Sequence, residues 1–471
     1  MSKKEIKRVM IAAPSSGSGK TTLTCALLEV LKKRGLDPAS FKCGPDYIDP
    51  LFHKKVLGIE SRNLDTYFSG AQGVRDAVSG CSKKYAVIEG VMGLYDGIRT
   101  EGIEGSAYEI ACEASSPVIL VMDASKTGRT VISLVKGILI DDTEHMVKGI
   151  ILNKISAAFY GKLKDVLEKE LSGIRADVRL LGFFPKDKRI GIVSRHLGLT
   201  LPGEIENIRE KLSVAAELLE ENVDVDAVIS IMDMALPTEQ DSEKKIVTQK
   251  NEPDTNLTLA VADDEAFCFY YRENLEAFKE RGVRICYFSP LKDEHLPEEA
   301  DGLLLGGGYP EHHLEDLSKN TSMLESIRNA LYAGLPSLAE CGGFMYLHKT
   351  ITDISGKEFK MAGVIDGNCF YTGKLVRFGY IKIQGVNEAF EKDGFFKSLA
   401  GMKGHEFHYY ESTFNGNAYR AAKPFDEGVR ECMTAGNNGI WGFPHFYYAS
   451  KPEFVDCFVK RMKEVGFAKH E

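Results

Sequence analysis

Short hydrophobic runs alternate with amphipathic stretches along the first half of the chain. Strand-like runs rich in β-branched residues cover residues 8–13, 85–89, 117–123 and 147–153, and a helical pattern covers residues 23–34. Strands that alternate with helices predict a parallel sheet with helices packed on it. We therefore expect an α/β domain over residues 1–235.

The pattern breaks at residues 236–256, LPTEQDSEKKIVTQKNEPDTN, which are polar, charged and poor in large apolar side chains. This composition predicts a linker. Hydrophobic strand patterns resume at residues 257–262, 284–288, 302–305 and 335–339. A second α/β domain is therefore expected over residues 257–471.

Composition narrows the class of protein. The 471 residues are 44% hydrophobic and 27% charged, as in folded globular chains, and the net charge of −9 opposes generic binding to nucleic acid or anionic membranes. The 10 cysteines form neither a C-x-x-C pair nor a zinc spacing. With no export signal or membrane-spanning apolar run, we expect a cytoplasmic protein whose partners are small molecules. The oligomeric state is not predicted.

The segment APSSGSGKTTLT follows a predicted strand and opens a predicted helix, which is the setting of a phosphate-binding loop. Gly17 and Gly19 allow backbone N–H groups to face phosphate oxygens, Lys20 can reach the β- and γ-phosphates, and Thr21 offers a hydroxyl to Mg²⁺. The first glycine of the usual pattern is replaced by Pro14. A Gly/Ser turn with a chance Lys-Thr is the weaker alternative. The predicted ATP-binding residues are Gly17, Ser18, Gly19, Lys20, Thr21 and Thr22.

Carboxylates follow the loop at three places. Asp46 and Asp49 lie between two prolines in FKCGPDYIDP, where we expect a rigid loop that holds Mg²⁺ or positions a substrate. Two turn aspartates bonded to local backbone are an equal alternative. Glu89 ends the strand YAVIE, and Asp96 lies in the glycine-bounded loop EGVMGLYDG that follows. Ligands bind at this edge of open α/β sheets. We therefore favour Glu89 as a residue that contacts Mg²⁺ or the activated carboxylate over the alternative of a solvated acid at the end of a strand.

Two further predictions concern the same edge of the sheet. Asn153 and Lys154 end the strand segment ILNK, where they are suited to hydrogen-bonding or stacking with a purine. For the metal, the expected ligands are Thr21, Asp46 and Glu89.

The second half carries a thiol in a special setting. Cys341 lies in LPSLAECGGFMYL between an apolar strand and a helical pattern, which is typical of a nucleophile elbow. A helix N-terminus there is expected to lower the pKa of the thiol, and the N–H of Gly342 can face an oxyanion. The run LLLGGGYPE supplies Gly307 and Gly308 as further oxyanion donors. A buried core cysteine is the alternative.

A thiol nucleophile needs a base, and the chain has 11 histidines. We favour His445, in WGFPHFYYAS, because it lies late in the domain beside strand-like residues. His405 and His408, in KGHEFHYYE, are expected to contact substrate or to serve a structural role.

These motifs, in this order over nearly the whole chain, resemble the cobyrinate a,c-diamide synthases, which are glutamine-dependent amidoligases of cobalamin biosynthesis. The resemblance implies an N-terminal P-loop domain similar to dethiobiotin synthetase and a C-terminal class I glutamine amidotransferase domain of the cobyrinate/cobyrate type. It also implies ATP, Mg²⁺, L-glutamine and cobyrinate as cofactor and substrates. Cys341 would be the glutaminase nucleophile and His445 its base. The implied synthetase-site residues are Asp46, Asp49, Glu89 and Asp96.

One position departs from ordinary triad amidotransferases, which carry a glutamate two residues after the catalytic histidine. Here that position is Tyr447, and the resembled family also lacks the glutamate. Family members often end in His-x-His, and Tyr447 replaces the second histidine as well. The sequence therefore does not predict a complete Cys-His-Glu triad.

Three alternatives remain open at this point. Nickel-sirohydrochlorin a,c-diamide synthases of coenzyme F430 biosynthesis share these motifs and differ in the macrocycle. A non-catalytic partitioning-type ATPase switch would usually carry a further lysine near the start of the loop, where this chain has Ser15, and would leave Cys341 unexplained. A cysteine hydrolase with a regulatory nucleotide domain would cleave glutamine or a peptide without forming an amide.

Overall fold

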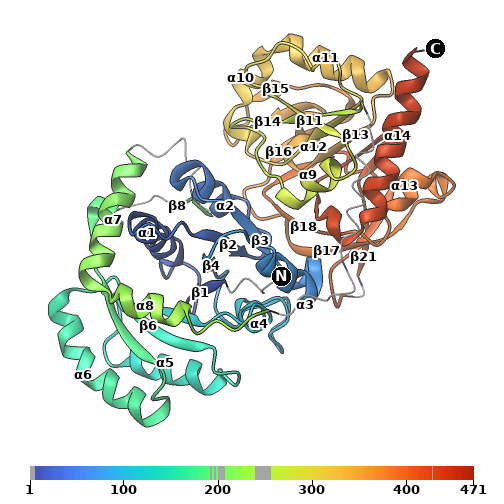
Figure 1. Cartoon of the computed structure of the whole chain (residues 1–471). Coiled ribbons are helices and arrows are strands. Elements are labelled where there is room, and N and C mark those ends of the chain that lie inside the picture. Colours follow the sequence, from blue (N-terminus) through green and yellow to red (C-terminus); the bar gives the residue numbers. More distant parts are fainter. Residues whose placement is uncertain are drawn as a thin grey trace. The chain divides into compact units, whose positions relative to one another are not determined.

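The computed structural model describes residues 6–190, 194–195, 198–199, 207–238, 256–426 and 428–470. The chain divides into two compact units, Met1–Lys245 and Ile246–Glu471 (Figure 1). Residues 239–255 of the predicted linker lie outside the described residues. No helix in the described ranges has both the length and the apolar character needed to cross a membrane.

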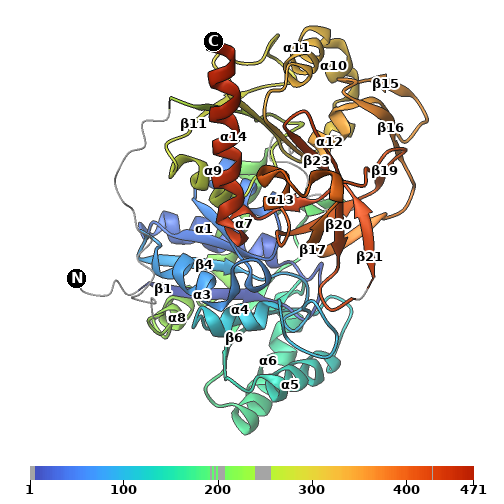
Figure 2. The ribbon, with the colours of Figure 1, turned by 90° about the vertical axis from the view of Figure 1, so that its right-hand side faces the viewer.

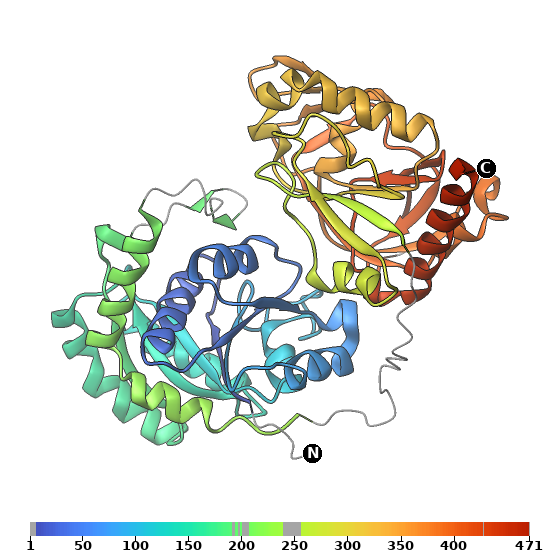
Figure 3. The same cartoon turned by 45° about the horizontal axis from the view of Figure 1, so that its top comes forward.

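The first unit is built on a seven-stranded parallel sheet with the order β3-β2-β4-β1-β5-β6-β7. Figure 3 shows helices packed around the strands of this unit. Its strands are β1 Lys7–Ala12, β2 Ala39–Cys43, β3 Ser61–Leu64, β4 Tyr85–Glu89, β5 Val118–Asp123, β6 Val147–Asn153 and β7 Arg179–Phe184, and a small hairpin joins β8 Ser194–Arg195 to β9 Gly198–Leu199. The helices are α1 Lys20–Lys33, α2 Ile48–Phe52, α3 Thr66–Ser79, α4 Ala107–Glu113, α5 Thr130–Asp141, α6 Ala157–Ile174, α7 Ile208–Asn222 and α8 Val225–Met232, with a π-helical turn at His53–Leu57 and a 3₁₀ turn at Lys188–Ile190.

Helices cover both faces of this sheet, which explains why its strands read as continuous hydrophobic runs. Alternate residues of β1 enter different cores: Met10 and Ala12 pack with α3 to α6, whereas Val9 and Ile11 pack with α1, α7 and α8. The carboxyl ends of β1, β2, β4 and β6 meet at one edge of the sheet because all these strands run parallel. The predicted loop, carboxylates and Asn153 all follow strands at that edge.

The second unit combines a mainly parallel sheet with two smaller sheets (Figure 2). The six-stranded sheet has the order β11-β10-β12-β13-β23-β22, and β22 alone runs antiparallel to its neighbour. Its strands are β10 Thr258–Ala262, β11 Arg284–Phe288, β12 Gly302–Leu305, β13 Ser337–Glu340, β22 Thr434–Gly436 and β23 Gly439–Gly442. This architecture confirms the predicted fold class, α/β in both halves.

The smaller sheets have the orders β15-β14-β16-β19 and β21-β20-β17-β18-β24. Their strands are β14 His348–Thr352, β15 Glu358–Lys360, β16 Ile365–Tyr371, β17 Arg377–Val386, β18 Lys403–His408, β19 Tyr410–Ser412, β20 Tyr419–Ala422, β21 Val429–Cys432 and β24 His445–Phe446. The helices of this unit are α9 Arg272–Lys279, α10 Leu314–Lys319, α11 Thr321–Tyr332, α12 Gly342–Tyr346, α13 Gly394–Ser398 and α14 Pro452–His470, with 3₁₀ turns at Pro310–His312, Glu388–Phe390 and Tyr448–Ser450.

Candidate active sites

The predicted phosphate-binding loop connects β1 to α1, as expected. Gly17 and Gly19 have φ values of 75° and 94°, in the left-handed region that favours glycine. Lys20 begins α1, and its ammonium donates to the carbonyl oxygens of Ser15 at 3.1 Å and Met92 at 2.5 Å. Loop carbonyls therefore surround the lysine ammonium where the nucleotide phosphates are expected.

Asn153 contacts the phosphate-binding loop. Its Nδ2 donates to the carbonyl oxygen of Ser18 at 2.7 Å and its Oδ1 accepts from the N–H of Lys154 at 2.8 Å, so both ends of the buried amide are used. A Cβ at Gly19 would lie 2.2 Å from Asn153 Nδ2. Lys154 donates to Gly17 O and to Asp123, each at 2.7 Å. Asn153 and Lys154 thus hold the phosphate-binding loop in place, and their contact with a purine stays a prediction.

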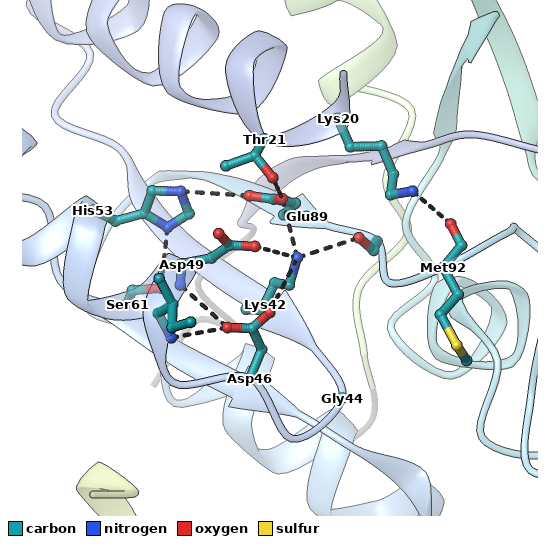
Figure 4. Close-up of polar contacts among 12 residues, drawn as sticks. Lys20, Thr21, Lys42, Gly44, Asp46, Asp49, His53, Ser61, Glu89 and Met92 are labelled. Atoms are coloured by element: carbon teal, nitrogen blue, oxygen red, sulfur yellow. Dashed lines mark hydrogen bonds and ion pairs between the residues drawn. The ribbon is translucent and has the colours of Figure 1, made fainter. Parts of the chain in front are cut away.

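Behind the loop, a buried lysine that the sequence analysis did not single out joins the predicted carboxylates (Figure 4). Lys42 on β2 lies 2.5 Å from Asp49 Oδ2, 3.0 Å from Glu89 Oε1 and 3.9 Å from Asp46 Oδ2. Lys42 and Glu89 are register partners on adjacent strands. The pairing of β2 with β4 therefore builds the cluster from residues 47 positions apart.

Glu89 connects this cluster to the phosphate-binding loop (Figure 4). Its Oε1 accepts a hydrogen bond of 2.5 Å from Thr21 Oγ1, and its Oε2 lies 3.5 Å from His53 Nε2. Glu89 Oε2 and His53 Nε2 are buried and have no hydrogen-bond partner among the described residues. The opposite ring nitrogen of His53 is 2.9 Å from Ser40 Oγ. Glu89 is thus a buried acid in an ion cluster, and the alternative of a solvated strand-end acid is wrong.

The cluster contains more negative than positive charge. Burial alone would lower the pKa of Lys42, but the carboxylates of Asp49 and Glu89 raise it well above its usual value. Burial opposes ionisation of Glu89, yet Lys42, His53 and Thr21 together hold its pKa below its usual range. Burial and the charges of Asp46 and Glu89 raise the pKa of Asp49. Three carboxyl groups share one ammonium, so a second cation there would favour the ionised form of Asp49.

These residues fit a magnesium ion. Thr21 and Glu89, two of the predicted ligands, already touch, and Glu89 Oε2 is a buried oxygen without a hydrogen-bond donor among the described residues. No group of three or more His, Cys, Asp or Glu side chains in the described ranges forms a metal cluster. Mg²⁺ at nucleotide sites usually takes one or two protein carboxylates and completes its shell with phosphates and water.

The prediction of a loop that carries both aspartates is half wrong. Asp46 lies in the loop, where its Oδ1 accepts from the N–H groups of Ile48 at 2.9 Å and Asp49 at 3.2 Å. Asp49 instead lies in the first turn of α2, where Pro50 is tolerated because an N–H there has no helical partner. Asp46 combines the turn role with the cluster role. Asp96 accepts from the N–H of Gly93 at 2.8 Å and orders the loop after β4.

In the second unit, Cys341 occupies the predicted elbow. It lies between β13 and α12 with φ 47° and ψ −102°, a conformation that is strained for a residue with a Cβ. Its N–H donates to Gly442 O at 2.8 Å, which ties the elbow to β23. Such backbone strain is typical of a nucleophile elbow, the sharp turn between a strand and a helix. The expected lowering of the thiol pKa is not observed: burial and the Glu311 carboxylate raise it, against a hydrogen bond from the Gly342 backbone.

Glycines let backbone segments approach the elbow closely. A Cβ at Gly342 would lie 2.9 Å from Pro310 Cδ, and one at Gly343 would lie 2.2 Å from Leu305 O. A Cβ at Gly307 would lie 2.2 Å from His445 Cε1, and Gly308 N is 3.3 Å from the Cβ position of Gly342. The three predicted oxyanion glycines, Gly307, Gly308 and Gly342, are therefore brought together with Cys341 and the imidazole of His445.

His445 begins β24 and is buried. Its ring stacks on His405 with centroids 5.0 Å apart, and its Nδ1 lies 3.9 Å from Glu340 Oε2. His405 is the register partner of His445, and its Nδ1 lies 3.2 Å from Tyr271 Oη. Burial, together with the nearby His405 and His408, holds the pKa of His445 well below its usual value. A neutral imidazole can accept a proton, as a general base must.

Sequence reasoning missed Lys42, His53 and Glu340. Lys42 carried a usable signal, because a lysine inside the buried strand segment ASFKC requires a partner. His53 and Glu340 carried none, because only the sheet pairings bring their partners close.

Comparisons with known proteins agree with this geometry. Residues 9–199 match the family described as "CobQ/CobB/MinD/ParA nucleotide binding domain", and residues 258–444 match "CobB/CobQ-like glutamine amidotransferase domain". The first description includes partitioning-type ATPases, whereas the second accounts for the unit that carries Cys341.

Relatives match over the full length. The cobyrinate a,c-diamide synthase of Caldanaerobacter subterraneus subsp. tengcongensis is 38% identical over 97% of this chain and 98% of its own. The cobyrinate a,c-diamide synthase of Clostridium tetani is 39% identical over 97% of this chain and 100% of its own. That of Methanosphaera stadtmanae is 36% identical over 95% of this chain and 97% of its own.

Proposed function

The chain belongs to the cobyrinate a,c-diamide synthase family and is a glutamine-dependent carbon–nitrogen ligase of cobalamin synthesis, and on this premise we propose that it amidates the a and c acetate carboxylates of cobyrinate. The choice of cobyrinate as the macrocycle rests on full-length similarity to relatives of that name. A partitioning switch and a stand-alone hydrolase both leave one of the two matched domains without a role.

Ammonia is generated in the second unit. The Cys341 thiol passes its proton to the neutral imidazole of His445 and attacks the side-chain amide carbon of glutamine. The N–H groups of Gly307, Gly308 and Gly342 receive the oxyanion of the tetrahedral intermediate. His445 returns the proton to the leaving nitrogen, so ammonia departs and a thioester remains, which water hydrolyses to glutamate.

The amide is formed in the first unit. The phosphate-binding loop and Lys20 hold ATP so that an acetate oxygen of the macrocycle attacks the γ-phosphorus and ADP leaves. Ammonia then attacks the acyl phosphate carbon, and phosphate departs. The region next to the loop is lined by Lys42, Asp46, Asp49 and Glu89. The excess of carboxyl groups there suits a bound cation, which would neutralise the charge of the phosphates.

Thr21 and Glu89, with Asp46 nearby, would hold Mg²⁺, which supplies neutralisation of phosphate charge when bound. The ammonium of Lys20 keeps its proton and leaves the loop carbonyls for the phosphates. Asp96 stays in its loop and orders the segment that carries Met92, one of the Lys20 acceptors.

Mass spectrometry of product formation tests the proposed substrate. Purified protein receives glutamine and Mg·ATP with either cobyrinate or nickel-sirohydrochlorin. We expect two successive amide conversions on cobyrinate and none on the nickel macrocycle. Conversion of nickel-sirohydrochlorin alone would assign the chain to that branch, and glutamine cleavage without any macrocycle product would refute the amidation proposal.

A further inference from the structure

The carboxylate of Glu340 faces the proposed base of the glutaminase. Glu340 is the last residue of β13, immediately before Cys341, and its Oε2 lies 3.9 Å from His445 Nδ1. The parallel pairing of β13 with β23 sets Glu340 opposite Gly442. The chain reaches His445 three residues later, so the sheet itself places the acid beside the imidazole.

Other groups hold Glu340 in this orientation. Tyr448 Oη donates to Glu340 Oε1 at 2.7 Å, and the backbone N–H of Phe446 also donates to the carboxylate. The side chain is buried, and no lysine or arginine forms an ion pair with it in the part of the chain that the structure describes. Oε1 is thus fixed by Tyr448, and Oε2 is directed at the imidazole.

The position two residues after His445, where other triad amidotransferases carry their acid, holds Tyr447. Its ring packs against Tyr271 at 5.4 Å between centroids in an edge-on arrangement. Tyr447 is therefore part of an aromatic contact, and the carboxylate that faces His445 belongs to the last residue of β13, just before the nucleophile.

The surroundings disfavour a charged imidazole unless an anion is near. His405 stacks on His445, and both His405 and His408 lower the pKa of His445. At the neighbouring thiol, burial and the charges of Glu311 and Glu406 raise the pKa of Cys341. Burial raises the pKa of Glu340 to about 8, so the carboxylate form that this role uses predominates above that pH. When the thiol proton moves to His445, the new imidazolium and the Glu340 carboxylate compensate each other's burial.

We propose that Glu340 is the positioning residue for His445 in the glutaminase reaction, a role that rests on the proposed functions of Cys341 and His445. Its Oε2 accepts the Nδ1–H, which leaves Nε2 free to take the thiol proton. The proton stays on the imidazole and passes to the leaving ammonia, and Glu340 remains a carboxylate. The 3.9 Å separation shortens when substrate binds, as catalytic hydrogen bonds commonly do.

Glu340→Gln tests this role because it keeps the shape and removes the charge. Glutamine hydrolysis is measured with cobyrinate and Mg·ATP present, and Cys341 alkylation by iodoacetamide is followed against pH. We expect kcat for glutamine to fall at least ~10-fold with KM little changed, since orienting acids contribute strongly to such bases. Alkylation should shift to higher pH, because the thiolate–imidazolium pair loses its anion. Ammonia-dependent synthesis should be unchanged.

Asp264→Asn is the matched control. Asp264 is a buried carboxylate of the same unit that accepts from the N–H groups of Ala266 at 2.8 Å and Leu291 at 2.9 Å. Its loss should lower stability but leave the alkylation profile in place. An unchanged kcat and profile in Glu340→Gln would overturn the proposal. Failure of the unmodified protein to hydrolyse glutamine would instead refute the proposed function.

A measurement on the unmodified protein covers the case in which Glu340→Gln does not fold. The ¹⁵N chemical shifts of His445, assigned by difference from His445→Gln, report which ring nitrogen carries the proton. Above pH 8, where Glu340 is ionised, the proposal requires the Nδ1–H form. Observation of the Nε2–H form would overturn it.

Discussion

Lys42 provides the positive charge that pairs with two buried carboxyl groups, those of Asp49 and Glu89. Replacing it by methionine leaves Asp49 and Glu89 buried without their cation, and breaking such a pair costs about 3–5 kcal/mol. We expect a lower unfolding temperature by calorimetry and no synthesis with either glutamine or ammonia. Lys83→Met is the control, because its 2.6 Å pair with Asp37 is on the surface and such pairs contribute at most about 1 kcal/mol. Equal stability of the two variants would contradict the cluster.

Lys20 makes nucleotide binding pH-dependent. Burial, followed by the charge of Lys42, lowers its pKa to about 8, so the free protein loses this proton as the pH rises through that value. Bound phosphates favour the charged ammonium, and binding at pH 8.5 must therefore take up protons. Calorimetric titration of Mg·ATP in buffers of different ionisation enthalpy measures this uptake, and Lys20→Arg should abolish it. Proton release, or none exchanged, at pH 8.5 would refute this assignment.

At the level of secondary-structure elements, the loop after β12 holds the imidazole of His445 in position. Ala at position 307 would set a Cβ 2.2 Å from His445 Cε1 while keeping the backbone N–H, so the imidazole must move. We expect Gly307→Ala to lower glutamine-dependent synthesis at least ~10-fold, because a positioned base contributes about 10²–10⁴-fold, and to spare ammonia-dependent synthesis. Gly394→Ala, where a Cβ meets nothing within 4 Å, is the control. Equal glutamine-dependent rates in both variants would contradict the predicted contact.

Hydrophobic runs predicted the parallel strands well, because strands buried on both faces need apolar side chains throughout. The bounds of β4, β6, β11 and β12 agree with the predicted ranges. Pro50 predicts a loop at Asp49 because proline usually breaks helices, but a helix tolerates proline in its first turn. The partners of Glu340 and Lys42 could not be identified from the sequence, even though Lys42 in its strand signals that it needs one. These partners lie 105 and 47 positions away, and the pairing of strands brings them close.

The whole molecule separates its chemistry between two units, each with its own hydrophobic cores and its own cluster of buried ionisable groups. The loop and carboxylates lie in one unit, and Cys341, His445 and the glycines lie in the other. Because the two sets share no residue, single substitutions should uncouple the source of nitrogen from the formation of the amide.

The most direct test of this division compares nitrogen donors on Cys341→Ala. The variant receives cobyrinate and Mg·ATP with either glutamine or ammonium chloride, and amide products are resolved by mass. We predict both amide conversions with ammonia and none with glutamine, whereas Lys20→Ala should form no amide from either donor. Amide formation from glutamine by Cys341→Ala, or its failure to use ammonia while still folded, would contradict the account.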